Sequence, residues 1–328
     1  MYPFHKCYLC GARRDLYPQI NNKKSVVICG ECLKKEYVKT TKVVKNKKKS
    51  SNWNDIVSPE TMNDFIGQKP IKTELITMLE ATKKHHIIVQ HCLFSGSFGL
   101  GKTTIAKIFG SMISKDWSIV NASNIASVED LPSSKVVVVD EIHTIKDEEW
   151  LLTVMDSGDQ TILGATTTAG RLSGPLRSRF VSLILQPYEV PDLELMVKSA
   201  SSNLKYDCPD YVANSVAVRG KTVARNALFL FKRVYDRIIL NNGVTPELLE
   251  NWFEAMKIDA DGLDNADRAY VNCLDKTRPI GLQNLSAMTG LDKITLEETI
   301  EPYLLTKGFL KRTARGRLLG DKEVINVW

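Results

Sequence analysis

Two different spacings of hydrophobic residues run through the middle of the chain, and together they predict strands alternating with helices. Residues 136–139 are four consecutive valines, a run of strand length that is typical of a central parallel strand covered on both faces. The apolar runs at 92–94 and 161–165 predict two further strands, and residues 105–113 carry apolar side chains at helical spacing. We therefore expect an α/β fold with a parallel sheet and flanking helices.

The two ends of the chain show other patterns. Residues 262–307 hold two short helical patterns and then a longer one, and residues 309–320 read as two short strands around a turn. This order of elements is the winged-helix layout. The first fifty residues carry too few large apolar side chains to fold around a core of their own.

Composition and charge narrow the class of protein. The chain has 328 residues, of which 43% are hydrophobic and 25% charged, which excludes disordered, collagenous and disulfide-scaffold classes. No apolar run reaches the ~18 residues that a membrane span needs, and no apolar signal core follows the N-terminus, so we expect no membrane contact and a cytoplasmic location.

The basic charge is concentrated at the N-terminus. Residues 1–50 hold 13 Lys or Arg against 3 Asp or Glu, whereas residues 51–328 hold 31 against 35. A basic segment on a near-neutral body is typical of a polyanion-binding appendage, most often for nucleic acid. The eight lysines of residues 34–49 are read either as a solvated linker alone or as a linker that also contacts DNA phosphates weakly.

Four cysteines in the same region predict a metal site. Cys7, Cys10, Cys29 and Cys32 form two C-x2-C pairs separated by eighteen residues, which falls within the spacing of zinc modules. Four thiolates leave no open position on Zn²⁺, so the site is expected to be structural, with metal binding supplying the folding energy. Two unrelated redox pairs are the alternative, and His5 is a possible substitute ligand.

A glycine-rich segment predicts the nucleotide site. It fits G-x4-G-K-[ST] between an apolar strand and a helical pattern, the context that identifies a P-loop. Backbone N–H groups of such a loop surround phosphate oxygens, the lysine reaches the β- and γ-phosphates, and the following hydroxyl binds Mg²⁺. The predicted nucleotide-binding residues are Gly96, Gly99, Gly101, Lys102, Thr103 and Thr104.

Two carboxylates follow the valine run. Asp140 stands at the carboxyl end of that strand, where α/β folds bind ligands, and is expected to hold Mg²⁺ through water. Glu141 is then the candidate general base that polarises the attacking water. The next strand ends in Thr166 and Thr167, and a polar side chain there is suited to orient the water or contact the γ-phosphate. ATP and Mg²⁺ are therefore the expected cofactors, beside Zn²⁺.

With these motifs, the sequence resembles the RuvB family of AAA+ ATPases, the ring-shaped motors of Holliday-junction branch migration. The resemblance runs from about Ile56 to the C-terminus, and it rests on segments in the family's order: IGQ (66–68), GSFGLGKTT, VVVVDEIH, LGATTTAG, PLRSRF and YEVPDL. It implies an AAA+ ATPase core (56–188), a helical lid (189–258) and a winged-helix DNA-binding domain (259–328), preceded by the zinc module (1–40) and a basic linker (41–55).

The resemblance also assigns roles to single residues. Arg179 takes the position of the arginine finger, which acts on the nucleotide of the neighbouring subunit in a ring, expected to be a hexamer. The first-sensor position falls on Thr167, and the second-sensor position on Arg225, after two extra residues. Residues lining the nucleotide pocket are Ile66, Gly67 and Tyr188, and those expected to contact DNA phosphates are Lys293, Arg312 and Arg317.

The chain departs from the family in its means of recruitment. RuvB proteins carry a β-hairpin between the Walker B strand and the sensor strand, which docks RuvA. Here residues 141–160 leave room for one helix and a short turn only. The P-loop reads SFGLG where the family prefers PPGLG, and Ser58 replaces a basic residue. We expect a protein partner other than RuvA, in a combination that would suit a phage or mobile-element protein.

Three functions remain open at this stage. The first is a DNA-stimulated ATPase with branch-migration or helicase-like motor activity in recombination, repair or replication. The second is an AAA+ clamp loader or helicase loader that remodels a replication protein without travelling along DNA, which the missing hairpin favours. The third is a zinc-finger DNA-binding protein that uses ATP only to oligomerise. The intact hydrolytic residues argue against the third, and the winged helix favours the first.

Overall fold

The computed structural model describes residues 16–21, 24–29, 52–85 and 87–322, and the chain divides between residues 55 and 56 into two compact units. In the first unit, β1 (Leu16–Asn21) and β2 (Lys24–Cys29) pair as an antiparallel hairpin that sets Leu16 opposite Cys29. The other three cysteines of the predicted zinc site, Cys7, Cys10 and Cys32, lie outside the described residues.

The second unit begins with an α/β core, as the hydrophobic pattern predicts. Five strands form one parallel sheet in the order β4-β5-β6-β3-β7. Helix α2 (Trp53–Val57) spans the boundary between the two units. The elements of this core are α3 (Lys69–His85), β3 (Cys92–Ser95), α4 (Lys102–Ile113), β4 (Trp117–Asn121), η1 (Ala122–Asn124), η2 (Val128–Asp130), β5 (Val136–Asp140), η3 (Ile142–Thr144), α5 (Glu149–Ser157), β6 (Thr161–Thr166), η4 (Ala169–Arg171), α6 (Gly174–Ser178) and β7 (Val181–Ile184).

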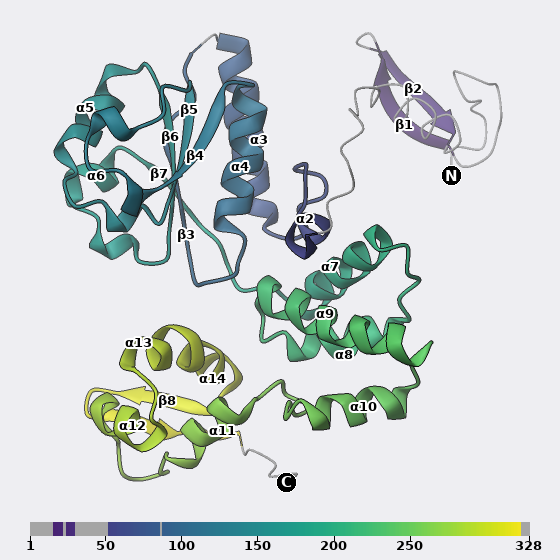
Figure 1. The fold of residues 1–328 in the computed structure, drawn as a ribbon. Coiled ribbons are helices and arrows are strands. Elements are labelled where there is room, and N and C mark those ends of the chain that lie inside the picture. The colour runs from purple at the N-terminus through teal and green to yellow at the C-terminus, as the bar shows by residue number, and fades with distance from the viewer. Residues whose placement is uncertain (1–15, 22–23, 30–51, 86, 323–328) are drawn as a thin grey trace. The chain divides into compact units, whose positions relative to one another are not determined.

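Helices cover both faces of this sheet, which explains why β5 is a run of valines. Helices α3 and α4 lie on one face, and α5 and α6 on the other (Figure 1). Successive side chains of a strand point to opposite faces. Val136 and Val138 accordingly pack in the cluster that holds Phe109 of α4, while Val137 and Val139 pack with Leu151 of α5. The strand therefore has no polar face, and its first charged residue, Asp140, marks the edge of the core.

The segment between β5 and β6 is described completely. It contains the 3₁₀ turn η3 and the helix α5, and residues 141–160 include no strand. The prediction that this segment has no room for a β-hairpin is confirmed.

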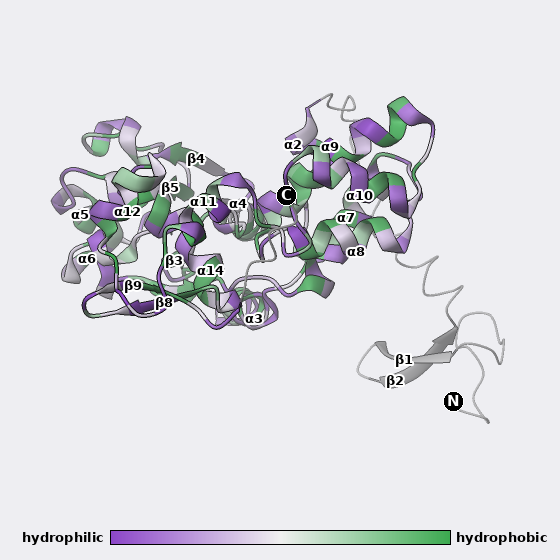
Figure 2. Ribbon diagram, turned by 90° about the horizontal axis from the view of Figure 1, so that it is seen from below, coloured by the Kyte–Doolittle hydropathy of each residue, from purple (hydrophilic) through white to green (hydrophobic). Residues whose placement is uncertain are grey.

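A group of four helices follows the sheet: α7 (Val190–Asn203), α8 (Asp210–Arg219), α9 (Ala224–Asn241) and α10 (Pro246–Ala255). Hydrophobic and hydrophilic bands alternate along them (Figure 2), as expected for helices that bury one face. Leu193 of α7 and Ala227 of α9 belong to the same core cluster as helices α3 and α4. These lid helices are thus packed against the side of the core that carries the P-loop helix α4.

The last elements form a winged helix, as predicted. Its elements are α11 (Asn265–Asn272), α12 (Leu282–Thr289), α13 (Lys293–Thr295), η5 (Leu296–Ile300), α14 (Glu301–Lys307), β8 (Leu310–Thr313) and β9 (Gly316–Leu319). Strands β8 and β9 form an antiparallel hairpin in which Arg312 pairs with Arg317. The hydrophobic core of the winged helix includes Tyr270, Leu304 and Phe309. Among the residues described, no helix is both long and apolar enough to cross a membrane.

Candidate nucleotide and DNA sites

The P-loop connects the carboxyl end of β3 to the first turn of α4, so it lies at the carboxyl edge of the parallel sheet. Its glycines are required by the backbone. Gly101, which precedes α4, has φ 94°, and Gly96 has φ 139°. A Cβ on Gly96 would lie 2.8 Å from the carbonyl oxygen of Leu185. Only glycine fits this path, and the loop leaves α4's first N–H groups available for an anion.

Lys102 is buried inside this loop. Its side chain is 7% exposed, and its Nζ donates hydrogen bonds to the carbonyl oxygens of Gly96 at 2.9 Å and Ser97 at 2.8 Å. Burial lowers the pKa of Lys102, and the charge of Arg225 lowers it further, whereas Glu141 and Asp140 raise it. A buried cation with carbonyl partners gains much from a nearby anion, so this environment suits phosphate groups.

The next residue faces the Walker B strand. Thr103 Oγ1 donates a hydrogen bond to Asp140 Oδ1 at 2.7 Å. A hydroxyl and a carboxylate are hard oxygen ligands of the kind that Mg²⁺ binds beside a nucleotide. The two predicted magnesium ligands are therefore in contact, and their chemistry fits the ion. Thr104 lies on α4 in the following position, partly buried.

Glu141 follows directly at the sheet edge. Its backbone is in the left-handed region, with φ 49° and ψ 45°. Its Oε2 lies 3.4 Å from Nδ1 of His143, and that same nitrogen lies 3.0 Å from Thr166 Oγ1. Thr167 is partly buried beside them. His143 therefore contacts both the candidate base Glu141 and Thr166, the last residue of β6. The sequence did not indicate a role for this histidine.

The expected nucleotide-lining residues also come together. Tyr188 is 4% exposed, and its hydroxyl donates to the carbonyl oxygen of Leu100 at 2.8 Å. Gly67 (φ 75°) lies against the Tyr188 ring, where an added Cβ would approach to 2.7 Å. Ile66 is partly buried beside it. Burial raises the pKa of Tyr188 to about 12, so this phenol stays neutral and keeps its hydrogen bond.

Arg225 lies in the first turn of α9, directly against the P-loop. Its backbone N–H donates to the carbonyl oxygen of Gly99 at 3.2 Å, and its Cβ would lie 2.9 Å from one added to Gly99. Two residues before α9, Lys221 and Thr222, have positive φ angles of 53° and 62°. The tight turn at these residues leads the chain into α9, so that Arg225 lies against the phosphate loop.

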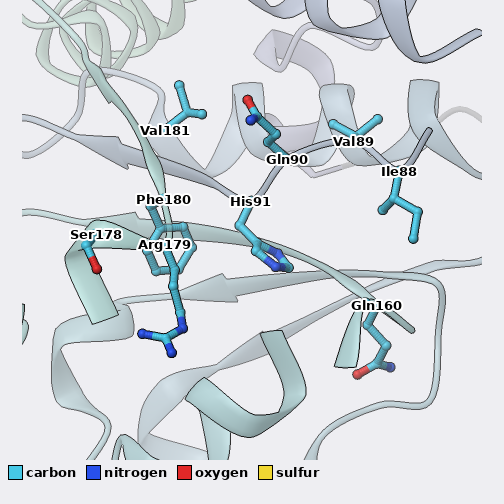
Figure 3. Close-up of a pocket in the computed structure, with 10 residues that line it drawn as sticks. Ile88, Val89, Gln90, His91, Gln160, Ser178, Arg179, Phe180 and Val181 are labelled. Atoms are coloured by element: carbon cyan, nitrogen blue, oxygen red, sulfur yellow. The ribbon is translucent and has the colours of Figure 1, made fainter. Parts of the chain in front are cut away.

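Arg179 lies at the opposite edge of the sheet. It precedes β7, whose first residue pairs with the amino end of β3, whereas the P-loop follows the carboxyl end of β3. Its guanidinium makes a bidentate ion pair with Asp156, with Nε–Oδ1 2.7 Å and Nη2–Oδ2 2.6 Å. It borders a cavity of about 360 Å³ that His91, Gln160 and Phe180 also line (Figure 3). Arg179 is therefore remote from this chain's own P-loop.

The predicted DNA contacts divide into two kinds. Lys293 is exposed at the start of α13. Arg312 and Arg317 instead bind the fully buried carboxylate of Glu301, Arg317 through Nε at 2.9 Å, and the Tyr270 hydroxyl donates to the same group at 2.7 Å. Hydrogen bonds from Tyr270 and the two arginines lower the pKa of Glu301 despite its desolvation. The side chain of Arg312 is 46% exposed and that of Arg317 is 14% exposed.

Sequence analysis missed three partners of the predicted residues. His143 was visible only as the last letter of VVVVDEIH, and Asp156 and Glu301 only as charges on helical patterns. His143 contacts Thr166, Asp156 contacts Arg179, and Glu301 contacts Arg312, and each pair is separated by at least 11 positions. The spacing of these residues in the sequence therefore did not indicate that they are in contact. The described residues contain no cluster of His, Cys, Asp and Glu suited to a metal, and Cys7, Cys10 and Cys32 of the predicted zinc site are not among the described residues.

Comparison with known proteins gives matches at both ends of the second unit. The model of the Holliday junction DNA helicase RuvB P-loop domain matches residues 57–160, and that of the RuvB C-terminal winged helix domain matches residues 260–325.

Whole-chain relatives agree. Holliday junction branch migration complex subunit RuvB of Thermotoga petrophila is 32% identical over 299 residues, covering 80% of this chain and 90% of that protein. The Campylobacter curvus subunit is 34% identical over 298 residues, with 80% and 88% covered. The solved Thermotoga maritima RuvB Holliday junction branch migration motor superposes with a TM-score of 0.74 at 34% identity, over 81% of this chain and 96% of that one.

Proposed function

Because this chain belongs to the RuvB family of Holliday junction branch migration ATPases, we propose that its ATP hydrolysis drives movement of branched DNA. The observation that carries this proposal is the assembled sheet edge, where Lys102, the Thr103–Asp140 pair and Glu141 meet in a chain that also has the family's winged helix. The chain is an ATP-hydrolysing, helicase-like DNA motor of this family.

The residues at the sheet edge support a division of labour during hydrolysis. Bound Mg²⁺ would neutralise phosphate charge, with Thr103 and Asp140 as its ligands. Lys102, held in the loop by two carbonyl oxygens, turns to the β- and γ-phosphates. Glu141 takes the proton of the attacking water, and Thr167 orients that water or contacts the γ-phosphate. Tyr188, with Ile66 and Gly67, encloses the base side of the nucleotide.

The position of Arg179 supports action between subunits. β3 has four residues, so the two ends of the sheet are separated by about 13 Å at ~3.3 Å per residue. An arginine at the amino edge does not reach the phosphates bound at the carboxyl edge of its own chain. We therefore propose a ring, a hexamer as in the sequence-based expectation, in which each Arg179 leaves Asp156 and contacts the neighbour's γ-phosphate.

On the winged helix, the contacts support different contributions to DNA binding. Lys293 is exposed at a helix start and is suited to a phosphate contact. Arg312 keeps about half of its side chain exposed beside Glu301 and is proposed to contact a phosphate with its outer N–H groups. Arg317, which is bound by Glu297 as well as Glu301, is proposed to hold the hairpin in place and to add only long-range charge.

Recruitment is proposed to differ from that of the relatives. With η3 and α5 alone between β5 and β6, the chain lacks the element that would dock RuvA in the family's way. We propose that the N-terminal unit, with its basic linker, selects the DNA or a different protein partner. The same observation is what favours the second candidate, a loader that remodels a replication protein on DNA.

We also propose that Cys7, Cys10, Cys29 and Cys32 hold one structural Zn²⁺. The support is their spacing, together with the β1–β2 hairpin that returns the chain at Cys29. Elemental analysis should find about one zinc per chain, and Cys29→Ser should release it while ATPase activity survives. Metal-free protein with unchanged solubility and DNA binding would refute the site.

One experiment separates motor from loader. A synthetic four-way junction with unequal arms is incubated with the protein, Mg²⁺ and ATP, and the release of duplex products is followed on a native gel. A motor converts the junction with ATP and fails with a non-hydrolysable analogue. Binding and hydrolysis without junction conversion, in an assay where a RuvAB control is active, would favour the loader.

A further inference from the structure

Three side chains from three elements meet behind the candidate base. Thr166 ends β6 and is fully buried, His143 lies in η3 with 11% of its side chain exposed, and Glu141 follows β5. His143 Nδ1 is 3.0 Å from Thr166 Oγ1 and 3.4 Å from Glu141 Oε2. The imidazole therefore stands between the carboxylate that would activate water and the strand that ends at the γ-phosphate position.

The hydrogen-bonding partners that Thr166 and Glu141 already have indicate which atom of each contact is the donor. Thr166 Oγ1 already accepts the backbone N–H of Thr168 at 3.0 Å. Glu141 Oε2 is buried, and no described residue gives it a hydrogen bond. A buried carboxylate oxygen requires a donor, and Nδ1 of His143 is the nitrogen beside it. The tautomer with a proton on Nδ1 donates its hydrogen bond to Thr166 Oγ1 at 3.0 Å, and the same N–H dipole, with its nitrogen 3.4 Å from Oε2, stabilises the Glu141 carboxylate electrostatically.

The backbone holds this arrangement. Glu141 has left-handed φ and ψ, which are unfavourable for a residue with a side chain. Thr144 fixes the turn, since its backbone N–H and its hydroxyl both donate to the Glu141 carbonyl oxygen at 2.9 Å. The strained turn brings residue 141 and residue 143 to the same side, toward the end of β6.

We propose that His143 is a positioning residue for hydrolysis, which anchors Glu141 Oε2 to Thr166 and so aims the other carboxylate oxygen at the attacking water. This inference rests on the proposed role of Glu141 as general base. The other oxygen, Oε1, belongs to a side chain that is 33% exposed, and it takes the proton from water as the hydroxide attacks. Thr167, the next residue, remains available for the nucleotide.

The test compares His143→Asn with His143→Gln. The Asn amide nitrogen is bonded to Cγ, as Nδ1 is, whereas the Gln amide nitrogen lies one bond further out and cannot occupy the same place. We expect His143→Asn to keep most of kcat and His143→Gln to lose about 10- to 100-fold, the scale of a catalytic group misplaced by about 1 Å. The Kd for ATP, measured by fluorescence of a labelled analogue, should change less than about twofold in both.

Thr166 supplies the matched pair on the other side of the contact. Thr166→Ser keeps the hydroxyl and should keep kcat, and Thr166→Val keeps the shape and should lose it. The double variant of His143→Gln and Thr166→Val should be no slower than the slower single variant, because the two residues act as one unit. Melting temperatures of all variants identify any that fail to fold. In that case the kcat values of His143→Asn and Thr166→Ser decide whether the contact between residues 143 and 166 supports hydrolysis.

The outcomes distinguish this inference from the function on which it rests. If Glu141→Gln hydrolyses ATP at the normal rate, the base assignment itself is wrong. If Glu141→Gln is inactive while His143→Gln has a normal kcat, or the two losses simply multiply in the double variant, then the positioning role alone is overturned.

Discussion

At the residue scale, the chain buries a charged side chain, Lys102, at the candidate nucleotide site. Lys102 is almost fully buried against two carbonyl oxygens, and its pKa is lowered mainly by burial. In a purely structural position such a group would be costly. At a P-loop the burial is useful, because a phosphate anion offsets the loss of solvation of the buried ammonium group.

The first prediction concerns that lysine. Lys102→Ala should weaken ATP binding by about 10- to 100-fold, because it removes charge-assisted hydrogen bonds worth about 1.5–3 kcal/mol. The Kd is measured by titrating a fluorescent ATP analogue. Lys107→Ala, on the exposed side of the same helix, is the control and should bind normally. Equal binding by both variants would show that Lys102 does not face the phosphates.

The second prediction concerns His91, which joins two elements in its neutral form. Its Nδ1 accepts the backbone N–H of Ile162 at 2.9 Å, and Nε2 contacts the carbonyl oxygen of Met155 at 3.2 Å. Burial lowers its pKa below the ordinary 6.5. As pH falls below about 6.5, the unfolded chain gains a proton that the folded chain refuses, so stability is lost until pH reaches the lower folded pKa.

Urea unfolding between pH 7.5 and 5.5 measures this effect. The free energy of unfolding should fall toward acid with a contribution from His91 of up to about 1.4 kcal/mol per pH unit. His91→Gln should remove that part of the slope, and His85→Gln, at an exposed position, should leave the slope as it is. A slope unchanged by His91→Gln would mean that this histidine titrates normally.

At the element scale, sequence patterns predicted whatever depends on neighbours along the chain. The valines of β5, the glycines around Lys102 and the hairpin at 310–319 are local, because burial, turn geometry and strand pairing act over a few residues. Contacts such as Asp156–Arg179 join residues 23 positions apart. The sequence shows those charges but not which helix face meets which loop, since packing decides that.

The winged helix shows the same division. Its layout was predictable, yet Arg312 and Arg317 were expected to face DNA, and the structure adds their shared partner Glu301. This carboxylate is fully buried and joins α14 to the hairpin β8–β9 and, through Tyr270, to α11. The same two arginines therefore close the fold of the domain, whatever they contribute to DNA binding.

The third prediction tests that closure. Glu301→Gln should lower the free energy of unfolding by about 2–4 kcal/mol, somewhat under the ~3–5 kcal/mol of a fully buried pair because Arg312 is half exposed. Glu297→Gln, which removes a partly exposed partner of Arg317, should cost about 0–1 kcal/mol. Urea unfolding provides both values. Similar costs for the two variants would contradict a central role for Glu301.

At the scale of the whole molecule, the candidate catalytic residues lie at two opposite ends of one sheet. The P-loop, Asp140 and Glu141 lie at the carboxyl edge, and Arg179 lies at the amino edge, paired with Asp156. If Arg179 acts between subunits as proposed, a monomer is an incomplete enzyme, because its Arg179 has no phosphate to act on. In the proposed ring, Arg179 exchanges its ion pair with Asp156 for the phosphate of the neighbouring subunit as the ring assembles.

The last prediction follows from this separation. Arg179→Ala should leave ATP binding nearly intact and reduce kcat by about 10³-fold or more, the scale associated with arginine fingers. Arg177 is an exposed residue on α6, two positions earlier, and Arg177→Ala is the control, which should retain most of the ATPase activity.

Mixing two inactive variants tests action across the subunit interface. Arg179→Ala subunits keep an intact pocket, and Lys102→Ala subunits keep an intact finger, so neither variant hydrolyses ATP alone. Mixed rings place intact fingers against intact pockets, and activity should reappear in proportion to those junctions. If mixed assembly is verified by labelled subunits and no activity returns, Arg179 does not act across the interface.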